Sequence, residues 1–310
     1  MVTSRRLVLG GGLAGIASAA GFAYRAAPAF WQQYASEWKR PIPSAPHTPD
    51  PSKWPDTGLH AAWIGHSTVL LKIDGFTVLT DPVFSTRAGI DLGVTTLGIK
   101  RLIAPAMELK RLPRIDLILL SHAHMDHFDI PSLRRLESRE RALITASRTS
   151  DLLRIGRYEE VTELGWGQKH QVGPLTVLGL EVNHWGARVR TDTYRGYNGY
   201  LLTAGRYRVL FAGDTANTDK LARIAGSKSV DLAIMPVGAY NPWIHYHCNP
   251  EQSWRMSQEA RSEFVMPVHN QTFQLSREPL REPIERLQNA AGANADRIVL
   301  REIGQEFHLS

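Results

Sequence analysis

Three histidines and two aspartates fall within nine residues of this sequence, in SHAHMDHFD at positions 121–129. The chain has 12 histidines among 310 residues, so a window of six would hold roughly 0.2 of them by chance, yet His122–His127 holds three. Imidazole and carboxylate groups bind Zn²⁺, and Mn²⁺ or Fe are alternatives for the same ligands. The crowding therefore indicates a metal site.

The apolar run IDLILL (115–120) before this cluster predicts a strand, and the end of that strand would divide the cluster into two groups. His122 and His124 are two residues apart, so on extended backbone both side chains point the same way and could bind one metal. Asp126 and His127 lie beyond the bend and would face a second metal. A histidine cluster that caps a helix or binds metal adventitiously is the alternative interpretation.

The spacing HxHxDH, present as His122-Ala123-His124-Met125-Asp126-His127, resembles the signature of the metallo-β-lactamase superfamily. The resemblance directs attention to three further ligand positions, each after an apolar run. His184 follows TVLGLEV, Asp214 stands in FAGDT, and His269 ends EFVMPVH. A single histidine at the end of a strand is more often only a hydrogen-bonded polar residue, but three candidates in the expected order favour the ligand interpretation.

Longer blocks resemble one branch of that superfamily, the bacterial branch that contains N-acyl-phosphatidylethanolamine-hydrolysing phospholipase D. They include GHSTVLLKIDGFTVLTDPVFSTRA (65–88), PVGAYNPWIHYHCNPEQS (236–253) and HNQTFQLSREPLREP (269–283). The resemblance extends from about residue 60 to the C-terminus. It implies an α/β fold of the metallo-β-lactamase type, an αββα sandwich with two central mixed β-sheets flanked by helices.

The same resemblance implies two zinc ions per chain, with Mn²⁺ or Fe as alternatives. One zinc would be bound by His122, His124 and His184, and the other by Asp126, His127 and His269, with Asp214 bridging both. Paired metals lower the pKa of a bound water toward ~7 and hold the resulting hydroxide between them. Asp126 would then carry a proton to the leaving group. Related oxygen-reducing proteins have a glutamate where His124 stands, which disfavours a redox function.

Other residues are candidates for supporting roles. A ligating imidazole usually donates its other N–H to a carboxylate or carbonyl, and Asp81 or His66 could contact the ligands in this way. The alternatives are a turn residue before Pro82 for Asp81 and a buried structural histidine for His66. His247 matches a histidine that lines the active site of the phospholipase branch, so substrate contact or proton donation is expected, against a role at the start of a helix. His245 has no such support.

Short apolar runs bounded by Gly, Pro, Asp or Asn predict strands at 61–64, 68–73, 76–81, 115–121, 142–146, 176–182, 199–204, 208–214, 231–237, 263–269 and 297–303. Amphipathic patterns predict helices at 131–139, 148–155, 218–226, 250–262 and 279–291. Asn249 and Pro250 are typical of a helix start. The alternation of strands and helices indicates two sheets in the middle with helices outside.

The N-terminus reads as a targeting segment. Arg5 and Arg6 precede an uncharged, Gly/Ala-rich run, which resembles a twin-arginine export signal over residues 1–30. A retained membrane anchor is the alternative, because the apolar run is close to the length that spans a bilayer. We therefore expect an exported protein, periplasmic or anchored to the inner membrane on its periplasmic side. Prolines at 41, 43, 46, 49, 51 and 55 predict a stiff linker over 31–57, before a hydrolase domain at 58–310.

Composition narrows the partners. With 43% hydrophobic and 21% charged residues the chain is globular, and one cysteine excludes both a disulfide framework and a Cys-rich zinc site. The net charge of +6 favours an anionic small-molecule or phospholipid substrate and is compatible with a membrane surface. Basic residues are scattered, so no nucleic acid partner is expected. The apolar, basic segment 83–112 predicts a lip that faces a membrane, with an ordinary packed loop as the alternative.

The favoured function is a dinuclear zinc hydrolase that acts on phosphodiester bonds, similar to the phospholipase D of the resembling branch. A lactonase or other ester hydrolase with a smaller, more polar pocket is the alternative, and a non-catalytic, metal-stabilised binding protein is a more remote one. One departure from the branch bears on the choice: Asn270 and Gln271 stand where the phospholipases tend to have Trp-Gly. Two amides beside the second metal would argue against a lipid-like pocket.

Overall fold

The computed structural model describes residues 28–93, 95–224 and 228–310, in two compact units, Met1–Pro41 and Ile42–Ser310. Helix α2 (Pro28–Trp38) belongs to the first unit, and its Trp31, Tyr34 and Trp38 rings follow one another with centroids 5.9 and 6.1 Å apart. The expected targeting segment falls almost wholly on residues 1–27, outside the described ranges. Among the described helices, none has the length and apolar character needed to cross a bilayer.

Residues 42–57, where we expected the second half of a linker, pack onto the second unit. The Pro43 carbonyl accepts from the Ala104 N–H at 2.8 Å, and the His47 N–H donates to the Ile303 carbonyl at 3.3 Å. Trp54 is buried in a hydrophobic cluster. The prolines stiffen this segment, but its carbonyls still accept hydrogen bonds and Trp54 supplies an apolar anchor. The second compact unit accordingly extends from Ile42 to Ser310.

The first sheet of the second unit has seven strands in the order β15-β1-β2-β3-β6-β7-β8. Strands β15, β1, β2 and β3 pair antiparallel, whereas β3, β6, β7 and β8 pair parallel. Asp74 and Gly75 both have positive φ in the β2–β3 turn, as a tight hairpin requires. The strands are β1 (Leu59–Gly65), β2 (Thr68–Ile73), β3 (Phe76–Thr80), β6 (Leu117–Leu119), β7 (Ala142–Ala146), β8 (Glu160–Leu164) and β15 (Glu306–Leu309).

The second sheet has six strands in the order β14-β13-β12-β11-β10-β9. It is antiparallel from β9 to β12 and parallel from β12 to β14. Its strands are β9 (Lys169–Val172), β10 (Leu175–Leu180), β11 (Gly199–Ala204), β12 (Tyr207–Phe211), β13 (Val230–Pro236) and β14 (Ser262–Val268). A separate hairpin pairs β4 (Arg87–Asp91) with β5 (Thr96–Lys100).

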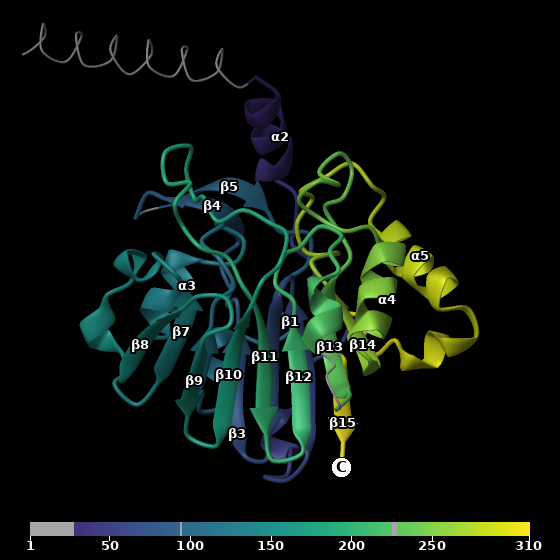
Figure 1. The fold of residues 1–310 in the computed structure, drawn as a ribbon. Coiled ribbons are helices and arrows are strands. Elements are labelled where there is room, and N and C mark those ends of the chain that lie inside the picture. Colours follow the sequence, from purple (N-terminus) through teal and green to yellow (C-terminus); the bar gives the residue numbers. More distant parts are fainter. Residues whose placement is uncertain (1–27, 94, 225–227) are drawn as a thin grey trace, which may run out of the picture. The chain divides into compact units, whose positions relative to one another are not determined.

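Helices lie on the outer faces of the two sheets (Figure 1). Helix α3 (Ile130–Arg135) accompanies β7 and β8, while α4 (Pro250–Glu259) and α5 (Glu282–Ala291) accompany β13 and β14. The expected start of α4 is confirmed, because Asn249 and Gln252 cap it reciprocally. The 3₁₀ segments are Pro51–Lys53, Leu109–Arg111, Ser150–Leu152, Ile155–Arg157, Lys220–Ile224 and Gly292–Arg297.

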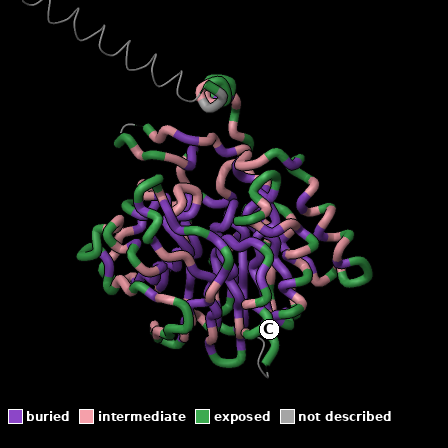
Figure 2. Tube along the Cα trace, turned by 45° about the horizontal axis from the view of Figure 1, so that its top comes forward, coloured by how far each residue is buried: buried purple, intermediate pink, exposed green. Residues whose placement is uncertain are grey.

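Three hydrophobic clusters define the layers. The largest lies between the sheets and joins residues such as Trp63 and Leu119 of the first sheet to Phe211 and Ile234 of the second. A second cluster covers the outer face of the first sheet beneath α3, and a third covers the outer face of the second sheet beneath α4. Figure 2 shows the buried residues concentrated along the strands. The predicted αββα sandwich with two mixed sheets is confirmed.

The prediction of individual elements was less complete. Residues 297–303 were expected to form a strand, which was wrong: only an isolated bridge joins Ile298 to Val265, and the preceding residues form a 3₁₀ turn. The expected helix at 148–155 contains only a short 3₁₀ turn, Ser150–Leu152. Strands β4, β5, β8, β9 and β15 were not predicted. Their partly exposed faces carry charged and polar residues, so they lack a continuous apolar run.

Tyr200 on β11 ties the two sheets together beside the stretch 121–129. Its buried hydroxyl donates to the Leu120 carbonyl at 2.8 Å and accepts from Asn198 Nδ2 at 3.2 Å. The Asn198 N–H also donates to the Ser121 carbonyl at 2.9 Å. Hydrogen bonds from the second sheet therefore fix the point where the first sheet ends and the histidine-rich stretch begins.

Replacing Tyr200 by Phe should destabilise the protein by about 1–3 kcal/mol, because it leaves the buried Leu120 carbonyl without a donor. The free energy of unfolding, measured by urea denaturation, checks this. Tyr194→Phe is the matched control: its ring is 54% exposed, and the change should be below about 0.5 kcal/mol. Equal stabilities of the two variants would contradict the bridging role.

Candidate metal centre

Every predicted ligand stands just after the C-terminal end of a strand. Stretch 121–127 follows β6, His184 follows β10, Asp214 follows β12 and His269 follows β14. Parallel strands of one sheet end at the same edge, and the bridge between His122 and Tyr197 joins the two sheets there. The fold therefore brings together side chains that are separated by up to 147 residues, from His122 to His269.

The first group consists of His122, His124, His184 and Asp214, whose potential ligand atoms all lie within 4.8 Å of one another. His122 Nε2 is 2.9 Å and His184 Nε2 is 3.3 Å from His124 Nδ1. Asp214 Oδ2 lies 3.9 Å from His122 Nε2 and 3.8 Å from His184 Nε2. These three histidines are those expected around the first metal.

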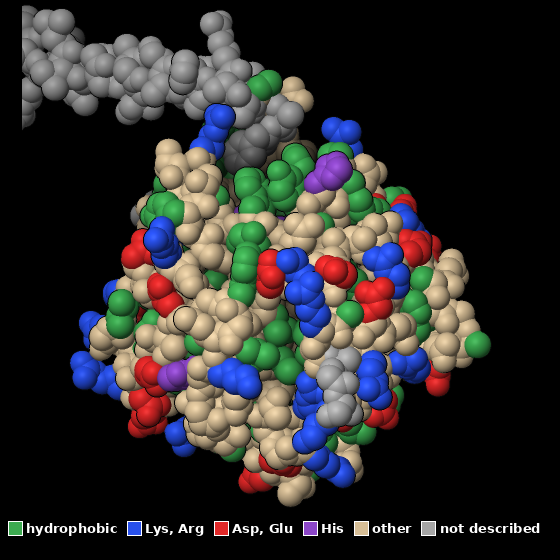
Figure 3. All heavy atoms as spheres, in the orientation of Figure 1, with side chains coloured by type: hydrophobic (Ala, Val, Ile, Leu, Met, Phe, Trp, Pro, Cys, Tyr) green, Lys and Arg blue, Asp and Glu red, His purple; other side chains and the backbone are tan. Residues whose placement is uncertain are grey.

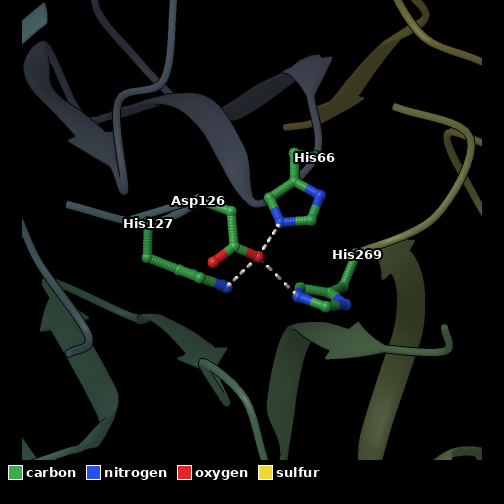
Figure 4. A group of neighbouring side chains, drawn as sticks. All are labelled: His66, Asp126, His127 and His269. Carbon is green, nitrogen blue, oxygen red and sulfur yellow. Dashed lines mark hydrogen bonds and ion pairs between the residues drawn. The ribbon is translucent and has the colours of Figure 1, made fainter. Parts of the chain in front are cut away.

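The second group consists of His66, Asp126, His127 and His269 (Figure 4). Asp126 Oδ2 is 3.6 Å from His127 Nε2 and 3.4 Å from His269 Nε2. Asp214 Oδ2 is 3.1 Å from each of the same two nitrogens. Asp214 thus lies between the two groups, where a bridging ligand must lie, and His66 joins a group in which only the other three were expected.

The donor set fits metal cations. Two nitrogens that face Asp214 Oδ2, His127 Nε2 and His269 Nε2, are buried and form no hydrogen bond of good geometry among the described residues. Buried polar atoms without a partner are rare and costly, which is accounted for when they are ligands. The histidines that converge on this point, with Asp126 and Asp214, match the ligands that Zn²⁺ and similar ions take.

The electrostatics of the cluster are also compatible with a bound cation. Burial alone would raise the pKa of Asp214, but His127 and His269 hold it well below its usual range. Burial would lower the pKa of His269, yet Asp214 and Asp126 raise it to about 9. Buried carboxylates remain ionised here only opposite positive charge. A metal ion supplies that charge while leaving the imidazoles neutral, as metal ligation requires.

Asp81 supports two of the ligands, which confirms the expected contact with a ligating histidine. His127 Nδ1–H donates to Asp81 Oδ2 at 2.7 Å. Ser121 Oγ–H also donates to Oδ2, at 2.6 Å, and in turn lies 2.8 Å from His122 Nδ1. On the far side, His184 Nδ1–H donates to the Tyr246 carbonyl at 2.8 Å. Each contact fixes the ring so that Nε2 points inward.

Sequence reasoning missed Ser121, Tyr246 and Arg188. Arg188 Nη1 donates to the carbonyls of Ala123 and Phe128, at 2.9 and 2.8 Å. These two hydrogen bonds connect Arg188 to both ends of the ligand stretch. Ser121 and Arg188 lie beside recognised motifs, which was a usable signal. The contact of the Tyr246 carbonyl with His184 could not be predicted from the sequence, because every residue has a backbone carbonyl.

Strained backbone marks the same region. His66, Asp81 and His269 are not glycine, yet they have φ values of 53°, 31° and 61°. Residues in this left-handed region cost free energy and persist where the surroundings hold them, often at functional sites. The contacts of His269 and Asp81 with the ligand groups account for their retention here.

A cavity of about 580 Å³ opens directly on His124 and Asp126. Its other walls come from the β4–β5 hairpin, the loop after His184, and Leu275, and they are mainly apolar. The lining residues are Ala88, Gly89, Ile99, His124, Met125, Asp126, Trp185, Ala187, Arg188, Val189, Arg190, Thr193 and Leu275. An elongated apolar group could therefore lie beside the metal ligands.

Asn270 and Gln271, expected to place amides beside the second metal, do not line this cavity, but both line a separate one together with His269. Asn270 Nδ2 donates to the Val268 carbonyl at 3.2 Å, and Gln271 Nε2 donates to the Arg301 carbonyl at 3.0 Å. Both side-chain amides thus donate hydrogen bonds to backbone carbonyls.

Segment 83–112 has features of both structures predicted for it, a lip that faces a membrane and an ordinary packed loop. The β4–β5 hairpin exposes Ile90 and Leu92, as a lip would. Arg87 and Arg101, expected among its basic edge residues, are instead buried and donate to the carbonyls of Gly98 and Val83. The segment is therefore a packed hairpin with an exposed apolar tip.

His247 lies over the centre, whereas His245 is exposed and belongs to none of the described ligand groups. The His247 ring stacks on His269 with centroids 5.2 Å apart, and its Nδ1 is 3.8 Å from Asp214 Oδ2. Burial lowers the pKa of His247 to about 4, so its imidazole is neutral. The position is compatible with the expected contact to substrate.

The model of a protein family described as "Beta-lactamase superfamily domain" matches residues 77–270, and this range includes every predicted ligand. The chain belongs to the metallo-β-lactamase superfamily. Its fold, its grouped His and Asp ligands and its similarity to metal-dependent hydrolases of this superfamily identify it as a metal-dependent hydrolase.

Relatives within the superfamily include an uncharacterised protein of Mycobacterium tuberculosis, 35% identical over 83% of this chain and 70% of the relative. N-acyl-phosphatidylethanolamine-hydrolyzing phospholipase D 1 of Caenorhabditis elegans is 30% identical over 78% of this chain and 72% of its own length. Among solved structures, the metallo hydrolase Igni18 of Ignicoccus hospitalis has a TM-score of 0.59 and 20% identity, over 82% of this chain and 99% of that one. That likeness concerns the fold.

Replacing Asp81 by Asn should lower the affinity for zinc by about 10- to 100-fold, since an amide cannot accept all the hydrogen bonds that orient His127 and Ser121. Asparagine keeps the shape and tolerates the left-handed backbone. Competition with a chromophoric chelator measures the affinity. Asp116→Asn, at the opposite end of β6, is the control and should bind zinc like the wild type; an unaltered affinity of Asp81→Asn would contradict the orienting role.

Proposed function

We propose that the protein is a dinuclear zinc hydrolase that cleaves phosphodiester bonds of amphiphilic substrates, in the manner of an N-acylphosphatidylethanolamine-hydrolysing phospholipase D. The observation that carries this proposal is the apolar cavity that opens on His124 and Asp126 with Arg188 in its wall. An apolar wall suits an acyl chain, and a guanidinium suits a phosphate. A lipid phosphodiester combines both groups.

The names of relatives support the same substrate class. Besides the nematode relative, a Saccharomyces cerevisiae protein named as a mitochondrial phospholipase D of this specificity is 32% identical over 85% of this chain and 58% of its own length. Identity at this level supports the class of reaction more strongly than the choice of substrate. The structure adds that the amides of Asn270 and Gln271 do not intrude on the cavity.

The position of each residue in the site suggests its role in the proposed reaction. His122, His124 and His184 would hold one metal, and Asp126, His127 and His269 the other, with Asp214 shared. When bound, the metals would supply a water activated at neutral pH and positive charge for the developing negative charge. Asp126 lines the cavity and would carry a proton to the leaving group. His247 lies over the centre and would contact the substrate.

The decisive experiment is a hydrolysis panel with a bis-aryl phosphodiester, an N-acyl phospholipid and a lactone. We expect turnover of both phosphodiesters and about two zinc ions per chain by elemental analysis. His124→Ala should reduce turnover by more than about 100-fold, since loss of a ligand exceeds the cost of losing an outer contact. His245→Ala is the matched control and should retain full activity.

Activity on lactones alone would replace the phosphodiesterase proposal with that of a lactonase or other ester hydrolase. Metal bound without turnover of any substrate would favour a metal-stabilised binding protein. A metal content near zero would refute the dinuclear centre itself.

We further propose that the chain is exported, to the periplasm or to the periplasmic side of the inner membrane, and takes its substrate from a bilayer. Arg5, Arg6 and the apolar run after them support export. Exposed Ile90, Leu92 and Val189 stand close to the cavity, with Arg190 beside them to meet anionic headgroups. Figure 3 shows exposed hydrophobic side chains interspersed with Lys and Arg side chains on one face of the molecule.

Leu92→Ser should weaken binding to vesicles of phosphatidylcholine and phosphatidylglycerol by at least about fivefold, because an apolar side chain no longer enters the bilayer. Co-sedimentation measures the partition. Ile155→Ser is the control, since Ile155 is similarly exposed but lies outside the β4–β5 hairpin. Equal partition of the two variants would argue against docking through the hairpin.

A further inference from the structure

His66 makes the shortest contact with Asp126 in the second ligand group. Its Nε2 lies 2.9 Å from Asp126 Oδ2, and both groups are largely shielded from solvent. His66 stands between β1 and β2, 60 residues before Asp126 and outside the HxHxDH motif. Figure 4 shows its ring pointing at the same carboxylate oxygen that His127 and His269 face.

The His66 ring is held firmly in this orientation. Its backbone N–H donates to Thr272 Oγ1 at 2.6 Å, and its carbonyl accepts from Trp63 Nε1 at 2.8 Å. The ring packs against His269, with centroids 4.2 Å apart, and against the edge of Phe273 at 5.1 Å. These contacts hold the left-handed backbone of His66 and keep its Nε2 directed at Asp126, while its Nδ1 is buried without a hydrogen-bond partner among the described residues.

These contacts distinguish the two oxygens of Asp126. Oδ2 faces all three imidazoles, at 2.9 Å from His66, 3.4 Å from His269 and 3.6 Å from His127. One oxygen thus contacts the three imidazoles, whereas the other takes part in none of these contacts, and Asp126 as a residue borders the cavity together with His124.

We propose that His66 is a positioning residue: its Nε2–H donates to Asp126 Oδ2, which keeps Oδ2 toward the second metal and Oδ1 toward the substrate. Without this donor the carboxylate can turn about its own bond and present both oxygens to the metal, so that none is left to take up a proton. The part that concerns the proton rests on the proposed hydrolase function. The part that concerns the geometry of Asp126 does not.

The test compares His66→Gln with His66→Met. Both side chains have similar length and bear the same backbone cost, but only glutamine retains an N–H that can reach Asp126. We expect His66→Met to lower kcat by about 10- to 100-fold with KM little changed, and to lower the affinity of the second zinc by a similar factor. His66→Gln should restore most of both.

Zinc affinity is measured by chelator competition and needs no substrate, so it tests the positioning of Asp126 even if no phosphodiester is cleaved. In an Asp126→Ala background the glutamine and methionine variants should become equal, because the side-chain acceptor is gone. That equality, together with the difference in the wild-type background, is the signature of a contact between the two residues.

Two results would overturn the proposal. If both variants lose one zinc per chain and glutamine restores nothing, His66 is itself a metal ligand. If both variants lose thermal stability equally, with zinc affinity and kcat unchanged in the folded protein, His66 is only a structural residue.

Discussion

The structure depends on keeping two carboxylates, Asp126 and Asp214, ionised in a buried place. An isolated negative charge in a protein interior is prohibitively unfavourable, so positive charge must face it. Six imidazoles have a ring nitrogen within 3.9 Å of one of the two carboxylates, and His127 and His269 are the nearest to Asp214, at 3.1 Å each. The same arrangement that solves this electrostatic problem creates the ligand set of a metal centre. Much of the surrounding chain can be understood as support for it.

That support comes from both sheets. The first supplies the stretch after β6 and, through Asp81, the acceptor that orients His127. The second supplies Asp214 and His269 from the ends of adjacent or nearby parallel strands. Tyr200 and Asn198 bind the two sheets to each other at this edge. The αββα sandwich thus does more than bury apolar surface: it aligns strand ends so that ligands from four segments meet.

The cavity beside the centre shows how a shared ligand set can serve a particular substrate. None of the ligands determines whether phosphorus or carbon is attacked. That choice depends on the side chains that line the cavity, which come mainly from the β4–β5 hairpin and the loop after His184. In the proposed function, their apolar surface and the guanidinium of Arg188 would bind an anionic amphiphile. The loop that carries Arg188 also holds the ligand stretch through Ala123 and Phe128, so specificity and metal binding share one element.

The sequence by itself determined the fold and the candidate ligands, because HxHxDH is contiguous and the later candidates each follow an apolar run that forms a strand. It also identified Asp81 as the partner of a ligating histidine. Only the tertiary structure decided that the amides of Asn270 and Gln271 turn to the backbone, that residues 42–57 pack onto the domain, and that His66 faces Asp126. These outcomes depend on contacts between residues far apart in the chain. The spacing of residue types encodes local direction and periodicity, but not which distant side chain fills the space opposite.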